Sequence, residues 1–282
     1  APYVRSLHRS LVHRAAYRLL GRLPLAHRRL NQELLEKARA FRPDVVLVVK
    51  GASVTPQTLQ GIKKDTGAVL VNYATDDPWN PAVSTRDLVD SIPYYDLYAC
   101  SKRAIVADVL AAGCPRAIFV PFGYKPSVHY PEQPATAAER ERFESDVAFI
   151  GGCDSDRVPY FESLVEKLPS LRLHLYGGYW DRHPQLRRYH HGFALGRDYR
   201  LALSGAKIAL NMVRRANRDG HVMRTFEIPA CGAFMLAERT EEHQELFEAG
   251  KEAVFFSGVE ELVDKIRYFL VHENERKSIA AN

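Results

Sequence analysis

The amino-acid sequence predicts an α/β protein made of two Rossmann-like, doubly wound domains that face a cleft. Apolar runs typical of buried strands alternate with amphipathic helical segments along most of the chain, which is the pattern of a parallel sheet. A polar stretch with two prolines interrupts this series after Tyr130. We therefore expect an N-terminal domain over residues 1–130, a linker over 131–145 and a C-terminal domain over 146–282.

The N-terminal domain is expected to open on helices and then to alternate strands with helices. Residues 4–20 place apolar side chains on one helical stripe and arginines on the other side, and a second helix is expected over 25–41. The stripe consists of Val4, Leu7, Leu11, Ala15 and Leu19. Strands are predicted at 44–49, 68–73, 95–100 and 117–120, with a helix over 55–66 that ends at Gly67. Because the series opens on helix-like sequence, this domain is expected to lack the first strand of its sheet.

The C-terminal domain repeats the alternation. Its strands are predicted at 146–150, 171–176, 207–213, 233–236 and 254–256, and an amphipathic helix over 259–271 closes the chain. Gly151 and Gly152 follow the first of these strands, and Gly177 follows the second. Glycines at such places let the backbone approach a ligand closely, and nearby Arg157 is within reach of a phosphate bound there. A simple tight turn is the alternative for the two glycines.

Composition indicates a soluble globular protein, with 46% hydrophobic and 26% charged residues. No run approaches the roughly 20 apolar residues of a membrane span. Arginine and histidine interrupt the apolar positions at the start of the chain, which argues against a signal peptide. The four cysteines form no CxxC pair, which favours a reducing cytoplasm over a disulfide framework or a structural zinc site.

The net charge of +5 is unevenly distributed. Residues 1–42 hold ten Lys/Arg and two Glu, or +8, which leaves −3 for the rest of the chain. Positive charge confined to one end does not support nucleic-acid binding. A basic amphipathic helix over 4–20 either packs on a sheet, which its direct run towards the first strand favours, or contacts an anionic membrane surface. The expected location is therefore cytoplasmic, with peripheral membrane contact left open.

The loop after the strand at 207–213 carries the strongest indication of a ligand. In open parallel sheets ligands bind beyond the carboxyl ends of strands, and cations beside a helix start suit a phosphate. The cationic side chains of this stretch are Arg214, Arg215, Arg218, His221 and Arg224. Asp219 and Glu227 could accept hydrogen bonds from ribose hydroxyls. A sugar nucleotide supplies both groups, whereas the alternative is a solvated loop in which Glu227 pairs with Arg224.

Two carboxylates and a histidine are candidates for catalysis. Asp76 and Asp77 follow a predicted strand, where they could bind a metal or deprotonate a hydroxyl; the alternative is an Asx turn ahead of Pro78. His221 could act as an acid, a base or a phosphate donor, or be an ordinary loop histidine. The chain contains no GxGxxG after a strand, no GxxxxGK[ST] and no GxSxG, which disfavours nicotinamide dehydrogenases, P-loop NTPases and α/β-hydrolases.

Three stretches carry a resemblance to a known family. They are SGAKIALNMV at 204–213, MRTFEIPACGAFML at 223–236 and ELFEAGKEAVFFSGVEELVDKIRYFL at 245–270. They resemble the C-terminal domain of a GT-B glycosyltransferase, most closely the CgeB-like family, which is named for a spore maturation protein. The FIGG turn at 149–152 and PFGYKPSVHY at 121–130 also match.

The resemblance implies a hexosyltransferase-type enzyme that moves sugar from a nucleoside-diphosphate sugar to a sugar, lipid or protein acceptor, without a metal or other cofactor. Many GT-B enzymes carry two glutamates separated by seven residues; Asp219 and Glu227 match those positions, the first shortened to Asp. The expected donor-binding residues are Gly151, Gly152, Arg157, Tyr176, Gly177, Asn211, Asp219, Gly220, Arg224, Thr225 and Glu227, and the catalytic candidates are Asp76, Asp77 and His221. A non-catalytic binding module and a nucleotide-sugar epimerase are the alternatives.

Overall fold

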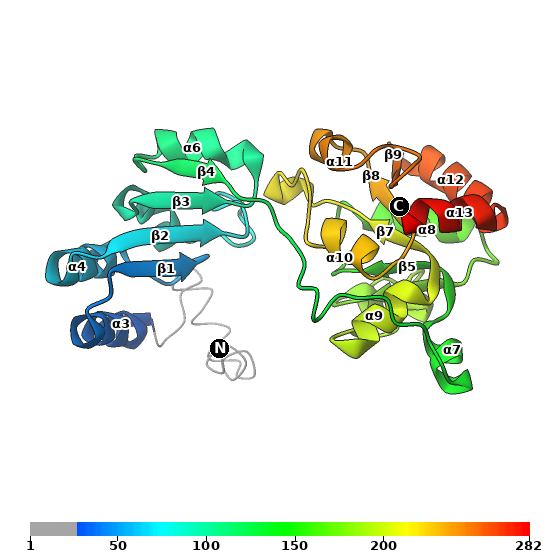
Figure 1. Cartoon of the computed structure of the whole chain (residues 1–282), viewed down its shortest axis with the longest axis horizontal. Helices are drawn as coiled ribbons and strands as arrows, with labels where there is room; N and C mark the ends of the chain where they lie inside the picture. Colours follow the sequence, from blue (N-terminus) through cyan, green and yellow to red (C-terminus); the bar gives the residue numbers. More distant parts are fainter. Residues whose placement is uncertain (1–26) are drawn as a thin grey trace. The chain divides into compact units, whose positions relative to one another are not determined.

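The computed structural model describes residues 27–282, which divide into two compact units (Figure 1). The first unit extends to Pro121 and also contains Ala216–Asp219, whereas the second contains Phe122–Arg215 and Gly220–Asn282. The helix predicted over 4–20 lies outside the described residues.

The sheet of the first unit runs in sequence order. Its strands are all parallel and lie in the order β1-β2-β3-β4. The elements are α3 (His27–Phe41), β1 (Val45–Val49), α4 (Pro56–Thr66), β2 (Val69–Ala74), α5 (Arg86–Asp90), β3 (Leu97–Cys100), α6 (Val106–Ala111) and β4 (Ala117–Phe119). Thr55 caps α4 by accepting a hydrogen bond from Thr58 N, and Gly67, at φ 74°, ends it as predicted.

The helices of the first unit cover one face of this sheet. Strand order advances steadily in one direction, so successive right-handed crossovers put their helices on the same side. Leu59 of α4 and Val109 of α6 accordingly share one core cluster with Leu70 of β2 and Tyr98 of β3.

The strand order in the sheet of the second unit changes direction after its first strand. Its parallel strands lie in the order β6-β5-β7-β8-β9, the flavodoxin-like order in which crossovers leave both sides of the first strand. The elements are α7 (Ala137–Phe143), β5 (Ser145–Ile150), α8 (Val158–Lys167), β6 (Leu173–Tyr176), α9 (Arg197–Ser204), β7 (Ala206–Asn211), α10 (Arg224–Ala230), β8 (Met235–Glu238), α11 (Glu241–Leu246), β9 (Val254–Phe256), α12 (Val259–Val271) and α13 (Glu273–Ala281). Two core clusters result, one with α8, α12 and α13 and the other with α9 and α10.

The parallel α/β class is confirmed, and each predicted strand is found within two residues of its expected ends. The domain division differs from the expected one, because residues 122–145 belong to the second unit rather than to a first domain and a linker. The expected linker contains α7, which a capping box between Thr136 and Glu139 starts and which buries Phe143 to 2% exposure. A short helix that buries mainly one aromatic residue has a polar sequence, which is why its composition resembled a linker.

A pair of buried histidines makes the second unit sensitive to acid. The rings of His174, on β6, and His191 stack with centroids 3.8 Å apart. Burial first, and the charge of His191 second, lower the pKa of His174 to about 4. Burial also lowers the pKa of His191. The His174 ring is therefore neutral in the folded protein near pH 6, where the unfolded chain begins to protonate it.

We expect the free energy of unfolding to decrease as the pH falls from 6.5 towards 4, because the unfolded state binds protons that folded His174 excludes. The loss should reach at most about 1.4 kcal/mol per pH unit for this one group. Urea denaturation at pH 7.5, 6.0 and 5.0 measures it. His174→Gln should flatten the dependence and the exposed control His272→Gln should not; equal slopes in the two variants would contradict this assignment.

Candidate functional site

The candidate site of the second unit lies where its strand order reverses. Ligands of open parallel sheets bind beyond the carboxyl ends of the strands at this switch point, which here lies between β5 and β7. Gly151 and Gly152 directly follow β5, and Met212 to Arg214 directly follow β7. Several of the predicted donor-binding residues therefore come from the two loops that flank the switch point.

The glycines allow two loops to pack backbone against backbone. Gly151 N donates to Tyr176 O at 2.8 Å, and a Cβ added to Gly177, at φ 124°, would lie 2.5 Å from Gly151 O. A Cβ on Gly151 itself would lie 2.8 Å from Phe149 Cζ. The side chain of Tyr176 is 2% exposed and belongs to the core, so this predicted donor residue presents only its carbonyl to the loop.

Two arginines converge on the switch point. Arg157 Nη1 donates to Gly152 O at 3.0 Å and its Nη2 to Met212 O at 3.2 Å, while Arg224 Nη2 donates to the same Met212 O at 3.3 Å. Their guanidinium carbons lie 5.2 and 5.3 Å from the Phe149 ring centroid. Two like charges that share one carbonyl and one ring raise the local positive potential, which suits an anionic ligand.

The two arginines differ in what they can offer that ligand. Arg157 is 3% exposed and forms an ion pair with Asp154 at 3.1 Å, so it braces the two loops. Asp154 also pairs with Arg214 at 3.4 Å. Arg224 is only half-buried and starts α10. Arg224 and the partly exposed Arg214 are therefore the cations best placed to touch a phosphate.

A buried network fixes the start of α10 against the end of β7. His243 Nδ1 faces the Glu238 carbonyl at 2.7 Å, and because a carbonyl only accepts, Nδ1 carries the proton. His243 Nε2 then accepts from Thr225 Oγ1 at 2.9 Å, which in turn accepts from Asn211 Nδ2 at 2.9 Å. Asn211 and Thr225 are both fully buried. These two predicted donor residues hold Arg224 in place through their side chains.

Glu227, one turn after Arg224, is buried beside two polar side chains. Its Oε2 accepts from the Tyr199 hydroxyl at 2.5 Å, and its Oε1 lies 3.5 Å from His129 Nε2. Burial, and then the charge of Glu227, raise the pKa of Tyr199 well above its usual range, so that hydroxyl remains a donor. Sequence reasoning did not find Tyr199 or His129, because neither is near Glu227 in sequence.

His221 is buried, and its neighbour Gly220 packs closely against Glu242. The Phe122 N–H donates to His221 Nε2 at 3.0 Å, so the ring proton is on Nδ1, which donates to Glu242 Oε2 at 2.5 Å. A Cβ on Gly220 would lie 2.2 Å from Glu242 Cδ. Both ring nitrogens of His221 are engaged, so the predicted acid–base role requires one of these bonds to open.

Asp76 and Asp77 lie in the first unit, beside the segment Ala216–Asp219. Asp76 pairs with Lys50 at 2.7 Å and accepts from Asn217 Nδ2 at 2.8 Å. Burial alone would raise the pKa of Asp76, but the hydrogen bonds from Asn217 and Lys50 lower it below its usual value. Asp77 pairs with Arg218 at 2.6 Å and forms the Asx turn by accepting from Trp79 N at 2.9 Å. Both carboxylates thus have structural partners, and their role as a base stays a prediction.

Asp219 also lies in the first unit, where Lys102 neutralises it. Lys102 Nζ and Asp219 Oδ1 are 2.7 Å apart, and the side chains are 2% and 3% exposed. Asp219 and Glu227, the predicted pair of ribose carboxylates, therefore belong to different units.

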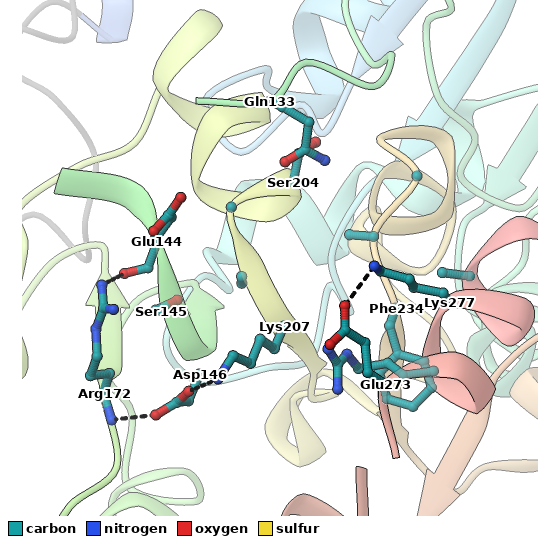
Figure 2. Close-up of a pocket in the computed structure, with 16 residues that line it drawn as sticks. Gln133, Glu144, Ser145, Asp146, Arg172, Ser204, Lys207, Phe234, Glu273 and Lys277 are labelled. Carbon is teal, nitrogen blue, oxygen red and sulfur yellow. Dashed lines mark hydrogen bonds and ion pairs between the residues drawn. The ribbon is translucent and has the colours of Figure 1, made fainter. Parts of the chain in front are cut away.

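A cavity of about 530 Å³ lies at the opposite end of the second sheet (Figure 2). It adjoins the first residues of β5 and β7, so it is distinct from the switch point. Figure 2 shows its charges paired with one another: Lys207 with Asp146 at 2.7 Å and Lys277 with Glu273 at 2.5 Å. We assign no ligand to it.

Within residues 27–282, no cluster of three or more His, Cys, Asp or Glu side chains is arranged to hold a metal ion. No helix in the same part of the chain is both long and apolar enough to cross a membrane.

Gly177→Ala should lower the melting temperature and weaken anion binding at the switch point, because its Cβ collides with Gly151 O. Gly250→Ala is the matched control: Gly250 also has positive φ, at 78°, but its Cβ meets nothing within 4 Å. Backbone strain should lower the free energy of unfolding of each variant by about 1 kcal/mol. The collision with Gly151 O should lower that of Gly177→Ala further. Thermal denaturation of both compares them directly, and equal losses would show that the close approach is unimportant.

Lys102→Met should destabilise the protein by about 3–5 kcal/mol, because it leaves the Asp219 carboxylate buried without its cation. Lys63→Met removes a more exposed pair with Asp96 and should cost at most about 1 kcal/mol. The double variant Lys102→Met/Asp219→Leu should recover part of the loss. Chemical denaturation measures all three, and a double variant less stable than Lys102→Met would argue against an unpaired charge as the cause.

Comparison with known proteins gives a family match over part of the chain and several solved structures of similar fold. Residues 157–282 match a protein-family model described as glycosyl transferase-like. No curated protein matches the sequence. HepE from Anabaena, solved in complex with UDP-glucose, matches with a TM-score of 0.64 at 13% identity over 90% of this chain and 75% of that chain.

Two other solved structures have a similar fold. Sucrose-phosphate synthase from Thermosynechococcus elongatus has a TM-score of 0.64 at 13% identity, covering 89% of this chain and 72% of the other. A putative UDP-N-acetylglucosamine 2-epimerase from Listeria monocytogenes has a TM-score of 0.56 at 15% identity, covering 90% and 73%. The chain thus has the fold of the GT-B glycosyltransferase superfamily, and its residues 157–282 match a glycosyl transferase-like family.

Proposed function

We propose that the protein transfers a hexosyl group from a nucleoside-diphosphate sugar to an acceptor hydroxyl, without a bound metal. The observation that carries the proposal is the pair Arg157 and Arg224, which meet at Met212 O beside Gly151 and Gly152. Arg157, Met212 and Arg224 all lie within residues 157–282, the stretch that matches the glycosyl transferase-like family.

The proposed donor spans two groups of side chains. Arg224 and Arg214 offset the charge of the diphosphate, which grows as the sugar–phosphate bond breaks. Glu227 accepts a hydrogen bond from a ribose hydroxyl; its carboxylate is ordered by Tyr199 and lies one helical turn from Arg224. Ordered donors and acceptors of this kind need no rearrangement when charge develops, which lowers the barrier to breaking the sugar–phosphate bond.

The acceptor is a sugar, a lipid or a protein, and Asp76, Asp77 or His221 would assist removal of its proton. We further propose assignment to the CgeB-like family and a cytoplasmic location, with peripheral membrane contact through the basic N-terminal segment as an alternative.

Two other functions have support from particular observations. The fold is shared with a putative UDP-N-acetylglucosamine 2-epimerase, which favours epimerisation of the sugar nucleotide as a second candidate. The engagement of Asp76, Asp77 and His221 with structural partners favours a non-catalytic binding module as a third. Formation of an epimer without acceptor identifies the second, and donor binding without any turnover identifies the third.

We expect one class of nucleoside-diphosphate sugar to raise the melting temperature in a panel of UDP, GDP, dTDP and CMP sugars. A ligand that binds only the folded state stabilises it by RT ln(1 + [L]/Kd), about 2.7 kcal/mol at 100-fold excess over Kd. UDP-glucose is the first to test, because HepE was solved with it. EDTA should leave the rise unchanged.

Variants locate the binding site. Glu227→Ala should abolish the rise, whereas Glu241→Ala, an exposed glutamate on α11, should keep it. Sugar transfer to an acceptor mixture, followed by mass spectrometry, then tests catalysis. No thermal shift with any of the nucleotides would reject the proposed donor, and a shift that EDTA removes would reject metal independence.

A further inference from the structure

A cavity of about 680 Å³ lies in the first unit, beside the loop after β2. It extends from Asp77 in that loop to Ala111, in the last turn of α6, and the residues that line it all belong to this unit. Its volume is within the roughly 300–1,000 Å³ of binding sites for small molecules. The cavity is therefore large enough for a small ligand.

One side of the cavity is apolar and centred on Trp79. The Trp79 side chain is half-buried and packs against the core cluster of the unit, which holds the indole in place. Exposed Pro81 and Ala111 lie beside it in the cavity lining. The face of an aromatic ring carries partial negative charge and attracts C–H groups that carry partial positive charge. The apolar face of a sugar ring presents such C–H groups.

The other side of the cavity is polar and centred on Arg218. Arg218 Nε donates to Asp77 Oδ2 at 2.6 Å, and its Nη1 donates to Asp108 Oδ2 at 2.6 Å. The side chains of Arg218 and Asp108 are 40% and 47% exposed. A guanidinium has five N–H donors and a carboxylate about four acceptor positions, so this ion pair leaves both groups with further capacity. Ligand hydroxyls, which donate and accept, suit such a pair.

A buried asparagine orders this polar side. Asn217 Oδ1 accepts from Asp77 N at 3.3 Å and from Asn80 Nδ2 at 2.8 Å, and both asparagines are buried. The next residue, Arg218, has a left-handed backbone with φ 49°, which a residue other than glycine keeps only where its surroundings hold it. The polar groups are thus fixed in advance, which reduces the entropic cost of binding a ligand.

The charges of the cavity select against anions. Its charged lining residues are the carboxylates of Asp77 and Asp108 and the single guanidinium of Arg218. A phosphate or carboxylate ligand would meet more negative than positive charge here, in contrast to the two arginines at the switch point. Arg218 also neutralises both carboxylates by direct pairing, which weakens their attraction for a cation. The ligand that fits is neutral and rich in hydroxyls.

We propose that this cavity binds a neutral saccharide, with one face of a sugar ring on Trp79 and its hydroxyls on Asp108 and Arg218. Binding here does not require the donor site of the second unit. One consequence rests on the proposed function: among sugar, lipid and protein acceptors, this cavity favours a sugar.

Saturation-transfer NMR on the full chain tests the ligand class. The probes are the methyl glycosides of glucose, galactose, mannose and N-acetylglucosamine, with glucuronic acid as the anionic comparison. At least one neutral glycoside should receive saturation from the protein, and glucuronic acid should not. No transfer to any of the four glycosides would overturn the proposal, as would equal transfer to glucuronic acid.

Variants test the place of binding. Asp108→Asn should weaken the affinity for the bound glycoside about tenfold, because a hydrogen bond to a charged group is lost. Asp90→Asn, which changes an exposed carboxylate on α5 that is paired with Arg86, should not. Ala111→Met fills the cavity at an exposed helix position and should also weaken binding, whereas Ala138→Met on α7 should not. Unchanged affinity in both Asp108→Asn and Ala111→Met would contradict the assignment.

The same variants separate this site from the proposed donor site. The rise in melting temperature caused by a nucleotide sugar should persist in Asp108→Asn and Ala111→Met. Glu227→Ala should instead remove that rise and leave saccharide binding intact. Loss of both kinds of binding in Asp108→Asn, with its melting temperature unchanged, would show that the two sites are not separate and would overturn the proposal.

Discussion

The right-handedness of βαβ crossovers determines most of what distinguishes the two units. In the second sheet, the chain leaves β5 first towards β6 and later towards β7, so helices cover both faces and a switch point opens between β5 and β7. In the first sheet, every step goes the same way, so among residues 27–121 one face receives all the helices. One stereochemical rule therefore places the candidate site in the second unit.

The chemistry proposed for the switch point depends on groups that would not touch the ligand themselves. Arg157 ties the loops after β5 and β7 together through two carbonyls, and the Asn211–Thr225–His243 network sets where α10 begins. Arg224 is thereby held over Met212 O before any ligand arrives. Fixed charge costs no reorganisation when a diphosphate leaves, which is the main advantage that a protein site has over water.

The sequence allowed the strands and the glycine loops to be predicted, because apolar periodicity and Gly after a strand are local signals. It did not reveal Tyr199 beside Glu227 or Lys102 beside Asp219, since these partners are far apart in the chain and lack a motif. It also suggested a linker where α7 lies, because a helix that buries one Phe is polar overall. Nor could it show that His221 accepts a backbone hydrogen bond, which depends on tertiary folding.

The loop after β7 delivers Ala216–Asp219 to the first unit, and this makes neither unit a continuous stretch of chain. A gene fragment that ends at Pro121 would lack Asn217, Arg218 and Asp219, the partners of Asp76, Asp77 and Lys102. It would lose the ion pairs that Arg218 forms with Asp77 and that Lys102 forms with Asp219, so the fragment should be less stable than the first unit of the whole chain. A chimaera that joins residues 1–121 of this chain to the second half of another protein would therefore have to keep residues 216–219 of this chain as well.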